Sequence, residues 1–215
     1  SAMVALENLG EDDYITVSKE AVASYGEMGN LTVGEELKVI DALKIMLMES
    51  SNDAAVALAE AVNVKISKEA NSHTFVNLMQ KLVQDFNFKA TNFSDPSGLE
   101  ISNVSSARDL TILTYRALSK EIIWEIMRLS EADIFSKDGK FSHHLTNSNK
   151  LLEKIEGIYG GKTGYTKEAG ECMILVLNAP NNNGKIILVI LGAQEGERFS
   201  LVEKLVNWTK EAYIW

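Results

Sequence analysis

The chain has 215 residues, of which 46% are hydrophobic and 24% are charged, a balance that predicts one globular domain with a sizeable core. The formal net charge of -9 counts against nucleic acid as the main partner, because binding to phosphates requires a basic face. The single cysteine, Cys172, cannot form an internal disulfide, and no uninterrupted apolar run of about 18 residues predicts a membrane-spanning helix.

The N-terminal half of the chain has the apolar spacing of helices. Residues 2–9 read as a helix already under way at the first residue, since no capping residue precedes them. The polar cluster at Ser50–Asp53 interrupts a second helical region and is typical of a helix N-cap. The helices expected here cover residues 2–9, two stretches within 31–62, 73–86, 105–119 and 120–129, with a turn at "NFSDPSGLE". Glu35 and Glu36 are interpreted as a solvated face.

After about residue 156, the helical spacing of apolar residues gives way to short, continuous apolar runs. The runs "GECMILVLNA" and "GKIILVILGA" predict two strands joined at "PNNNG", and their continuous apolar character favours a sheet covered on both faces. We expect antiparallel strands near 158–166, 170–178 and 185–193, with an amphipathic C-terminal helix packed on them. The fold class is therefore α/β (α+β): a helical subregion at 31–130, then a sheet and a helix at 156–215, within one domain spanning 1–215.

The stretch "GIYGGKTGY" allows two functional interpretations. A phosphate-binding loop has the pattern Gly-x-x-x-x-Gly-Lys-Thr and is followed by a helix that holds the phosphates. Glu156 stands where the first glycine belongs, and a strand pattern follows Thr163, so nucleotide binding is disfavoured. A Lys-Thr-Gly strand instead places an amine and a hydroxyl beside a reacting acyl group, and its glycine leaves room for a substrate along the strand edge.

The second interpretation requires a Ser-x-Asn sequence as a partner motif. In that chemistry the serine relays a proton and the asparagine positions the substrate amide. Ser50-Ser51-Asn52 is the one occurrence in the chain. One such match is about what chance supplies, and the same residues also suit a helix cap, so the motif is weak evidence by itself.

Several segments in order carry a family resemblance. "MESSNDAAVALAEAV", "TNFSDPSGLE", "SSARDLTIL", "NSNKLL" and "GGKTGYTKEAGECMILV" resemble the D-alanyl-D-alanine carboxypeptidases, the low-molecular-mass penicillin-binding proteins of the β-lactamase/transpeptidase-like fold. The family pattern Ser-x-Asn-Asp-Ala matches 50–54. The pattern Gly-x-Lys-Thr-Gly-Tyr-Thr, followed by Ala-Gly, matches 160–166 and 169–170. The resemblance runs from about residue 3 to the C-terminus.

The chain departs from the family pattern at two places. Asp95-Pro96-Ser97-Gly98-Leu99 stands where the family often has Asn-Pro-His-Gly-Leu, which changes a turn. The second departure concerns the nucleophile, because the 215 residues contain no Ser-x-x-Lys. In the family that motif immediately precedes a segment like "AMVALENL", and two strands precede the motif. We therefore expect the nucleophile and those strands to lie upstream, and this chain by itself to be inactive.

The resemblance implies a reaction and roles for three residues. A serine attacks the D-Ala-D-Ala bond of a peptidoglycan stem peptide, with a lysine one helical turn away as base, and water then hydrolyses the acyl-enzyme. Ser50 passes a proton to the leaving amine, Asn52 holds the substrate amide, and Lys162 adds positive potential. Ser50, Asn52 and Lys162 are thus the candidate catalytic residues, and we expect Asn52 and Lys162 to face one cleft.

Four further residues are implied in binding the substrate. Thr163 binds the terminal carboxylate, Gly164 leaves room for the peptide, and the backbone N–H of Tyr165 supplies half of an oxyanion hole. Arg198 is a second candidate for binding the carboxylate; a solvated charge on the last helix is an equal alternative.

The resemblance also implies partners and a location. We expect stem peptides as substrate, β-lactams as ligands of the intact enzyme, and an extracytoplasmic, envelope-associated protein. We expect no cofactor and no metal, since the adjacent His143 and His144 point in different directions. The family pairs the strand at 185–191 with its first N-terminal strand, so this strand is expected to be an open edge that a second copy can cover. The alternatives are a β-lactamase and a non-catalytic peptidoglycan-binding module of the same fold.

Overall fold

The computed structural model describes residues 1–24, 30–180 and 184–213. The chain forms two compact units. Unit 1 comprises Ser1–Val104 and Glu131–Thr146, and unit 2 comprises Ser105–Ser130 and Asn147–Trp215. This division differs from the subregions expected from the sequence, because the helices within 105–130 group with the sheet. Within the described residues, every helix is too short or too polar to cross a membrane.

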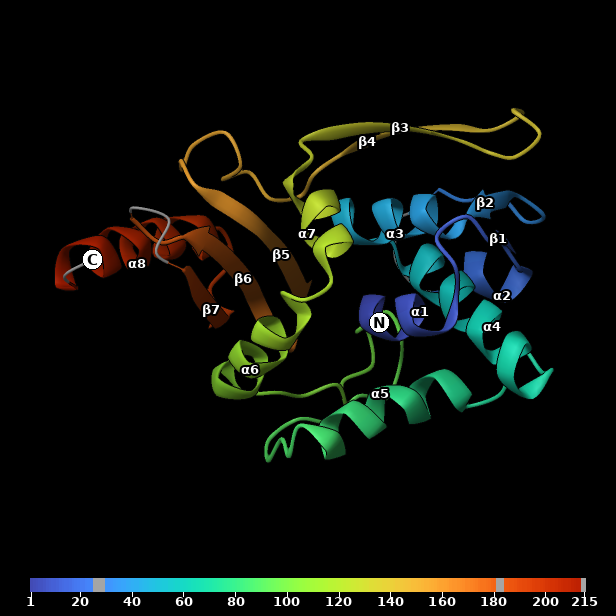
Figure 1. The fold of residues 1–215 in the computed structure, drawn as a ribbon, viewed down its shortest axis with the longest axis horizontal. Coiled ribbons are helices and arrows are strands. Elements are labelled where there is room, and N and C mark those ends of the chain that lie inside the picture. The colour runs from blue at the N-terminus through green and yellow to red at the C-terminus, as the bar shows by residue number, and fades with distance from the viewer. Residues whose placement is uncertain (25–29, 181–183, 214–215) are drawn as a thin grey trace. The chain divides into compact units, whose positions relative to one another are not determined.

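Unit 1 is built around one central helix. Its helices are α1 (Ala2–Asn8), α2 (Lys19–Val22), α3 (Val39–Met48), α4 (Asn52–Ser67) and α5 (Thr74–Asp85) (Figure 1). Helix α4 contacts each of the other four. Four of its ten buried residues are alanines, whose small side chains allow neighbouring helices to approach closely. The expected helices at 2–9, within 31–62 and at 73–86 are confirmed.

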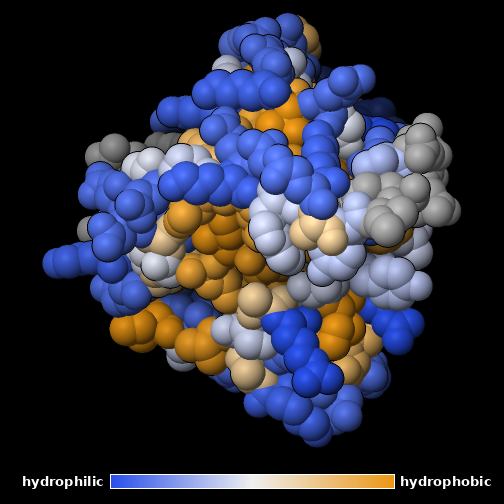
Figure 2. All heavy atoms as spheres, turned by 90° about the vertical axis from the view of Figure 1, so that its left-hand side faces the viewer, coloured by the Kyte–Doolittle hydropathy of each residue, from blue (hydrophilic) through white to orange (hydrophobic). Residues whose placement is uncertain are grey.

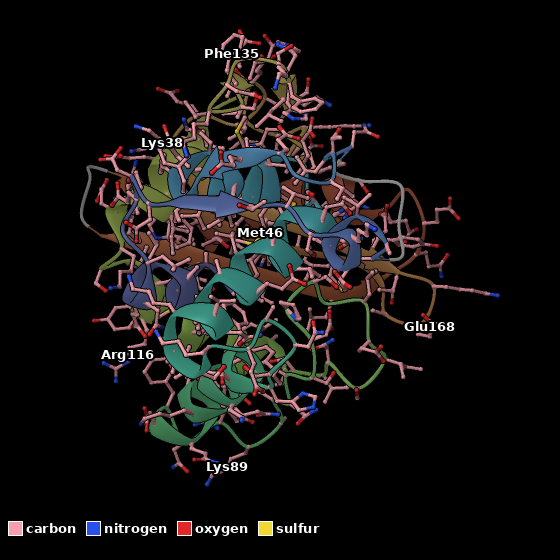
Figure 3. The ribbon with its side chains drawn as sticks, turned by 90° about the vertical axis from the view of Figure 1, so that its right-hand side faces the viewer. Lys38, Met46, Lys89, Arg116, Phe135 and Glu168 are labelled. Carbon is pink, nitrogen blue, oxygen red and sulfur yellow. The ribbon has the colours of Figure 1, made fainter. Side chains whose placement is uncertain are left out.

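Unit 1 also contains two antiparallel ribbons that the sequence did not indicate. Strands β1 (Tyr14–Thr16) and β2 (Glu36–Lys38) form one, and β3 (Glu131–Phe135) and β4 (Ser142–Thr146) form the other. Each strand has only three to five residues, too few for a two-residue periodicity to stand out. Phe135 lies at the outer end of the second ribbon and is 63% exposed (Figure 3).

The interpretation of Glu35 as part of a solvated face is wrong. Glu35 is 1% exposed, and its Oε1 lies 2.6 Å from Nε2 of His143 on β4. Its Oε2 accepts a hydrogen bond from the backbone N–H of Thr32 at 3.1 Å. A buried carboxylate needs such partners. His143 lies 108 residues further along the chain, so a local sequence pattern cannot reveal that it pairs with Glu35.

Unit 2 is a three-stranded antiparallel sheet with helices on both faces. The strands are β5 (Ile158–Thr166), β6 (Gly170–Asn178) and β7 (Lys185–Ala193), in the order β5-β6-β7. The helices are α6 (Ala107–Ala117), α7 (Glu121–Arg128) and α8 (Arg198–Ala212). All three strands and these helices occur where the sequence predicted them. The predicted "PNNNG" connection includes 181–183, which lie outside the described residues.

Alternate residues of the strands face different helices. Leu175 of β6 and Leu188 of β7 are paired in register and pack with Val202 and Val206 of α8. The adjacent residue Val176 faces the other side and is fully buried. Helices α6 and α7 contact β7 and β5 and lie on the side of the sheet opposite to α8 (Figure 1). This arrangement confirms the prediction of a sheet covered on both faces.

Strands β5 and β7 are the two edges of this sheet within the described residues. The view in Figure 2, from the side on which α8 lies in Figure 1, shows hydrophobic residues at the surface between hydrophilic ones. In unit 2 the exposed large hydrophobic side chains include Leu191 of β7, at 41%, and Trp208 of α8, at 56%. The edge at β7 therefore combines unpaired backbone groups with an apolar side chain.

Strand β5 passes so close to α7 that one position has no room for a side chain. A Cβ atom at Gly160 would lie 2.8 Å from Cε3 of Trp124 and 3.1 Å from Cβ of Met127. Trp124 is 2% exposed, and its indole N–H donates to the carbonyl of Ala117 at 2.9 Å, so the ring cannot swing away. The close approach fixes the distance between β5 and α7.

We predict that Gly160→Ala destabilises the chain by about 1–3 kcal/mol, the range typical of overpacking a closed core. Gly164→Ala on the same strand is the matched control. Its Cβ would meet only Cβ of Cys172, at 3.8 Å, so a change within about 0.5 kcal/mol is expected. Urea unfolding measures both, and equal stabilities of the two variants would contradict the packing argument.

Candidate active site

The Ser-x-Asn motif lies in unit 1, in the short connection between two buried helices. Helix α3 ends with Glu49 as its C-cap, and α4 begins at Asn52. The Oγ of Ser51 accepts the backbone N–H of Ala54 at 3.1 Å and so caps α4. Ser51 is 1% exposed and Asn52 is 9% exposed. The capping role that the sequence indicated therefore belongs to the middle residue, and the two flanking residues remain candidates for chemistry.

Ser50 adopts a left-handed backbone conformation, with a φ of +65°. For a residue with a Cβ this conformation costs roughly 1–2 kcal/mol. It turns the chain from α3 into α4 over three residues, Glu49 to Ser51. A backbone outlier at a position with a candidate proton-relay hydroxyl is typical of functional sites, where the surrounding packing holds the strain.

The Lys-Thr-Gly segment lies on β5, the strand at one edge of the sheet in unit 2. The Nζ of Lys162 donates to the carbonyl of Thr163 at 2.8 Å. The Oγ1 of Thr163 lies 2.7 Å from Oγ of Ser148, in the connection that precedes β5. Thr163 is 8% exposed. The amine and the hydroxyl are therefore both held by short hydrogen bonds.

Arg198, the first residue of α8, lies beside this segment. One terminal nitrogen, Nη1, donates to the carbonyls of Gly164 at 2.8 Å and Cys172 at 3.3 Å. The other, Nη2, pairs with Oε1 of Glu171 at 3.1 Å, and the backbone N–H of Arg198 donates to Oε2 of Glu171 at 2.9 Å. The Arg198 side chain is only 13% exposed, so the alternative of a solvated charge is wrong.

Burial, hydrogen bonding and neighbouring charges shift the pKa values of Lys162 and Glu171. Burial, aided by the positive charge of Arg198, lowers the pKa of Lys162 from 10.5 to about 8. The backbone N–H of Arg198, followed by its guanidinium charge, lowers the pKa of Glu171. Lys162 is thus mostly protonated near neutral pH, and Glu171 is ionised. The protonated amine of Lys162 suits a site that attracts a carboxylate, whereas the ionised Glu171 offsets the charge of Arg198.

Gly164 and Tyr165 complete the β5 segment. The Gly164 carbonyl is occupied by Arg198, and Tyr165 pairs in register with Glu171 on β6. The Tyr165 side chain is 56% exposed, so its ring stands outside the core. Unit 2 therefore brings together five of the predicted residues, which are Lys162, Thr163, Gly164, Tyr165 and Arg198, while Ser50 and Asn52 belong to unit 1. A shared cleft for Asn52 and Lys162 stays a prediction.

Two residues at this site were missed in the sequence. Glu171 follows the Ala-Gly pair and carries no pattern of its own, but as a lone acid at the start of an apolar strand it needed a partner. Ser148 lies between two asparagines, and that polar cluster was the available signal. In the described part of the chain, no group of three or more His, Cys, Asp or Glu side chains is arranged to hold a metal ion.

The fold matches those of solved DD-peptidases. A solved structure of a Streptomyces DD-transpeptidase mutant matches with a TM-score of 0.84 at 25% identity, over 96% of this chain and 83% of that one. The D-alanyl-D-alanine carboxypeptidase of Mycobacterium tuberculosis matches with a TM-score of 0.84 at 22% identity, over 97% and 77%. The second likeness bears on the fold alone.

Residues 2–195 match the D-alanyl-D-alanine carboxypeptidase family. The chain therefore belongs to that family. It is 32% identical to the carboxypeptidase DacF of Bacillus subtilis, over 94% of this chain and 50% of DacF. It is 30% identical to the D-alanyl-D-alanine endopeptidase of Pseudomonas aeruginosa, over 100% of this chain and 68% of that protein. The chain thus spans half of DacF and about two thirds of the endopeptidase.

We predict that Ser50→Gly yields a more stable chain than Ser50→Ala, by about 0.5–1 kcal/mol. Both variants lose the hydroxyl and its contacts, but glycine adopts a φ of +65° without steric cost, whereas alanine retains the strain. The midpoints of urea unfolding compare the two directly. An alanine variant as stable as the glycine variant would show that the conformation at residue 50 is not strained.

Lys162 should make the folded chain more stable as the pH rises from about 8 towards 10.5. In that range the unfolded chain holds a proton on Lys162 that the folded chain has released, so unfolding takes up protons and stability increases with pH, by at most about 1.4 kcal/mol per pH unit. Lys162→Met removes this contribution. Urea unfolding of both proteins at several pH values tests it, and parallel pH profiles would contradict it.

Proposed function

We propose that this chain is the main part of the catalytic region of a serine-type D-Ala-D-Ala carboxypeptidase that removes the terminal D-alanine from peptidoglycan stem peptides. The observation that carries the proposal is the arrangement in unit 2, where an amine, a hydroxyl and a guanidinium gather at one edge strand. This set suits the terminal carboxylate of a peptide, because the charge of Lys162 attracts it and a hydroxyl can donate to it, while Glu171 offsets much of the charge of Arg198. Family membership supports the same reaction.

The proposed reaction passes through an acyl-enzyme. A serine oxygen attacks the carbonyl carbon of the D-Ala-D-Ala bond, and a neighbouring lysine takes up the serine proton. Ser50 passes its proton to the nitrogen of the leaving D-alanine and takes up the proton held by the lysine, so that the C–N bond breaks and a neutral amine departs. Water then attacks the ester and releases the shortened peptide. Because the 215 residues contain no Ser-x-x-Lys, the proposal places the nucleophile and its lysine upstream in the native protein.

The remaining roles follow the chemistry of each side chain. Asn52 holds the substrate amide through its own amide group. Lys162 supplies positive potential, and Thr163 donates to the carboxylate. The N–H of Tyr165 stabilises the oxyanion, with Gly164 leaving room for the peptide. Arg198 adds charge near the carboxylate, although three of its N–H groups are already directed at fixed acceptors.

A second candidate reaction is cleavage of cross-linked peptides. The Pseudomonas aeruginosa relative that covers 100% of this chain is named an endopeptidase. Carboxypeptidase and endopeptidase break the same kind of D-alanyl bond and differ in the leaving group, which is a free D-alanine in one case and a second peptide in the other. The cationic site described above suits a leaving D-alanine that carries a free carboxylate. Carboxypeptidase activity therefore remains the leading proposal.

The proposal extends to the partners and the location of the native protein. Substrates in peptidoglycan require an extracytoplasmic, envelope-associated enzyme, and β-lactams are expected to acylate its serine. Within the described residues, β7 is an edge of its sheet, and an edge strand can pair with another strand. We propose that a strand of a second copy of this chain pairs with it. Lys185 is the only charged residue of β7, so little in the strand opposes such pairing.

We predict that the native protein with its upstream segment releases D-alanine from a pentapeptide and forms a covalent adduct with penicillin, whereas the 215-residue chain alone forms none. Lys162→Ala in the longer protein should slow acylation on the order of 10²-fold, as expected for losing an electrostatic group at the reacting centre. D-alanine release and mass spectrometry measure the two activities.

Lys167→Ala is the matched control, because Lys167 is an exposed lysine in the turn that follows the same strand. It should leave acylation unchanged. A stoichiometric adduct on the 215-residue chain would show that the nucleophile lies within it. Release of peptide from cross-linked substrates, with no release of D-alanine from the pentapeptide, would favour the endopeptidase.

A further inference from the structure

The segment Asn147-Ser148-Asn149 is braced between α7 and β5. Nδ2 of Asn147 donates to the carbonyl of Leu129 at 2.8 Å and to that of Met127 at 3.3 Å, at the end of α7. Its Oδ1 accepts the backbone N–H of Asn149 at 2.9 Å. Asn147 is 8% exposed and Asn149 is 2% exposed. The backbone on both sides of Ser148 is therefore fixed by buried side chains.

This brace also reaches β5 directly. A Cβ atom at Gly161 would lie 3.0 Å from Nδ2 of Asn149, so the asparagine amide rests against the strand where only glycine fits. Thr163 follows two residues later, and successive odd positions of a strand share a face. Ser148 is consequently held against the same face of β5 as Thr163, with its Oγ 2.7 Å from Oγ1 of Thr163.

The proton count of this hydroxyl pair has a chemical consequence. Each hydroxyl carries one proton and can both donate and accept. One of the two protons lies in the bond between Ser148 and Thr163, so the pair always keeps one O–H for a third group. That third group must be an acceptor. An ionised carboxylate can only accept hydrogen bonds. If Thr163 binds the substrate as proposed, the terminal carboxylate of the substrate lies within hydrogen-bond distance of the Thr163 hydroxyl.

We propose that Ser148 is a positioning residue, which donates its proton to Oγ1 of Thr163 and thereby directs the Thr163 proton to the terminal carboxylate of the substrate. The proposal rests on the proposed function, since it names the donor that orients the carboxylate-binding hydroxyl. Donation from Ser148 also polarises the Thr163 O–H, because hydrogen bonds in a chain strengthen one another in a partly buried site. Ser148 acts through Thr163 and needs no contact with the substrate.

The test uses the native protein with Ser148→Ala. We expect kcat/KM for a pentapeptide ending in a free carboxylate to fall about three- to tenfold, the effect of one neutral hydrogen bond. The same pentapeptide with a C-terminal amide should change much less, so the preference for acid over amide should fall. Ser148→Thr, which retains the hydroxyl, should restore the preference. Unfolding curves of each variant confirm that it is folded.

Thr163→Val separates a positioning role from a structural one. If Ser148 acts only through the Thr163 hydroxyl, Ser148→Ala has no further effect on the acid substrate once Thr163 is valine. Ser119→Ala is the matched control, because Ser119 is an exposed serine of unit 2 that also donates one hydrogen bond, to the carbonyl of Arg116 at 3.0 Å. It should leave the acid-to-amide preference unchanged.

The outcomes are distinct. An unaltered preference in Ser148→Ala, an equal loss on both substrates, or additive effects with Thr163→Val would each overturn the proposal while the wild-type protein still releases D-alanine. A folded wild-type protein that releases no D-alanine from the acid substrate would overturn the proposed function, and the role of Ser148 with it. A lost preference that returns in Ser148→Thr supports both.

Discussion

The arrangement of unit 2 depends on how closely β5 approaches its neighbours on both faces. On one face Gly160 lies against the ring of Trp124, and on the other Gly161 lies against the amide of Asn149, at distances that leave no room for a Cβ atom; Gly161 is also close to the carbonyl of Ile174 on the paired strand β6. A strand clamped in this way has little freedom to shift or rotate. Lys162 and Thr163 come next in the chain, so their directions are set by the two glycines before them.

The second constraint is electrostatic. Arg198 brings a positive charge next to Lys162, and two like charges in a partly buried site repel each other. Glu171 balances Arg198 through two hydrogen bonds, one to the guanidinium and one to the backbone at the start of α8. The same carboxylate therefore holds a helix in place and offsets a charge. An anion entering the site meets one amine and one guanidinium whose positions are already fixed.

Much of the fold could be predicted because long elements carry strong local patterns. Strands β5 to β7 have nine residues each, and β6 and β7 are almost wholly apolar. The polar cluster at Ser50–Asp53 likewise indicated a helix N-cap, and in the structure Ser51 caps α4. The short ribbons were not predictable, since β1 and β2 have three residues each and β1 packs against α4, which comes much later in the chain.

The candidate site was predictable where a motif carries chemistry and not where a side chain acts through another. Lys162 and Thr163 stand in a recognisable pattern, and unit 2 gives both of them polar partners. The bonds from Ser148 to Thr163 and from Glu171 to Arg198 join residues 15 and 27 positions apart. Spacing of that kind has no periodicity, so only the three-dimensional structure pairs them.

The return of the chain to unit 1 at residues 131–146 has a consequence for how the protein folds. The buried carboxylate of Glu35 obtains its partner His143 only after 108 further residues have been made, and the backbone N–H of Thr146 reaches back to Oε1 of Glu49 across 97. Contacts of such long sequence separation close late and slow the rate of folding. During synthesis on the ribosome, the Glu35 carboxylate therefore lacks its partner His143 until the second ribbon, β3 and β4, has been made. The chain thus couples the completion of its first unit to the synthesis of the segment that separates it from the Lys-Thr-Gly strand.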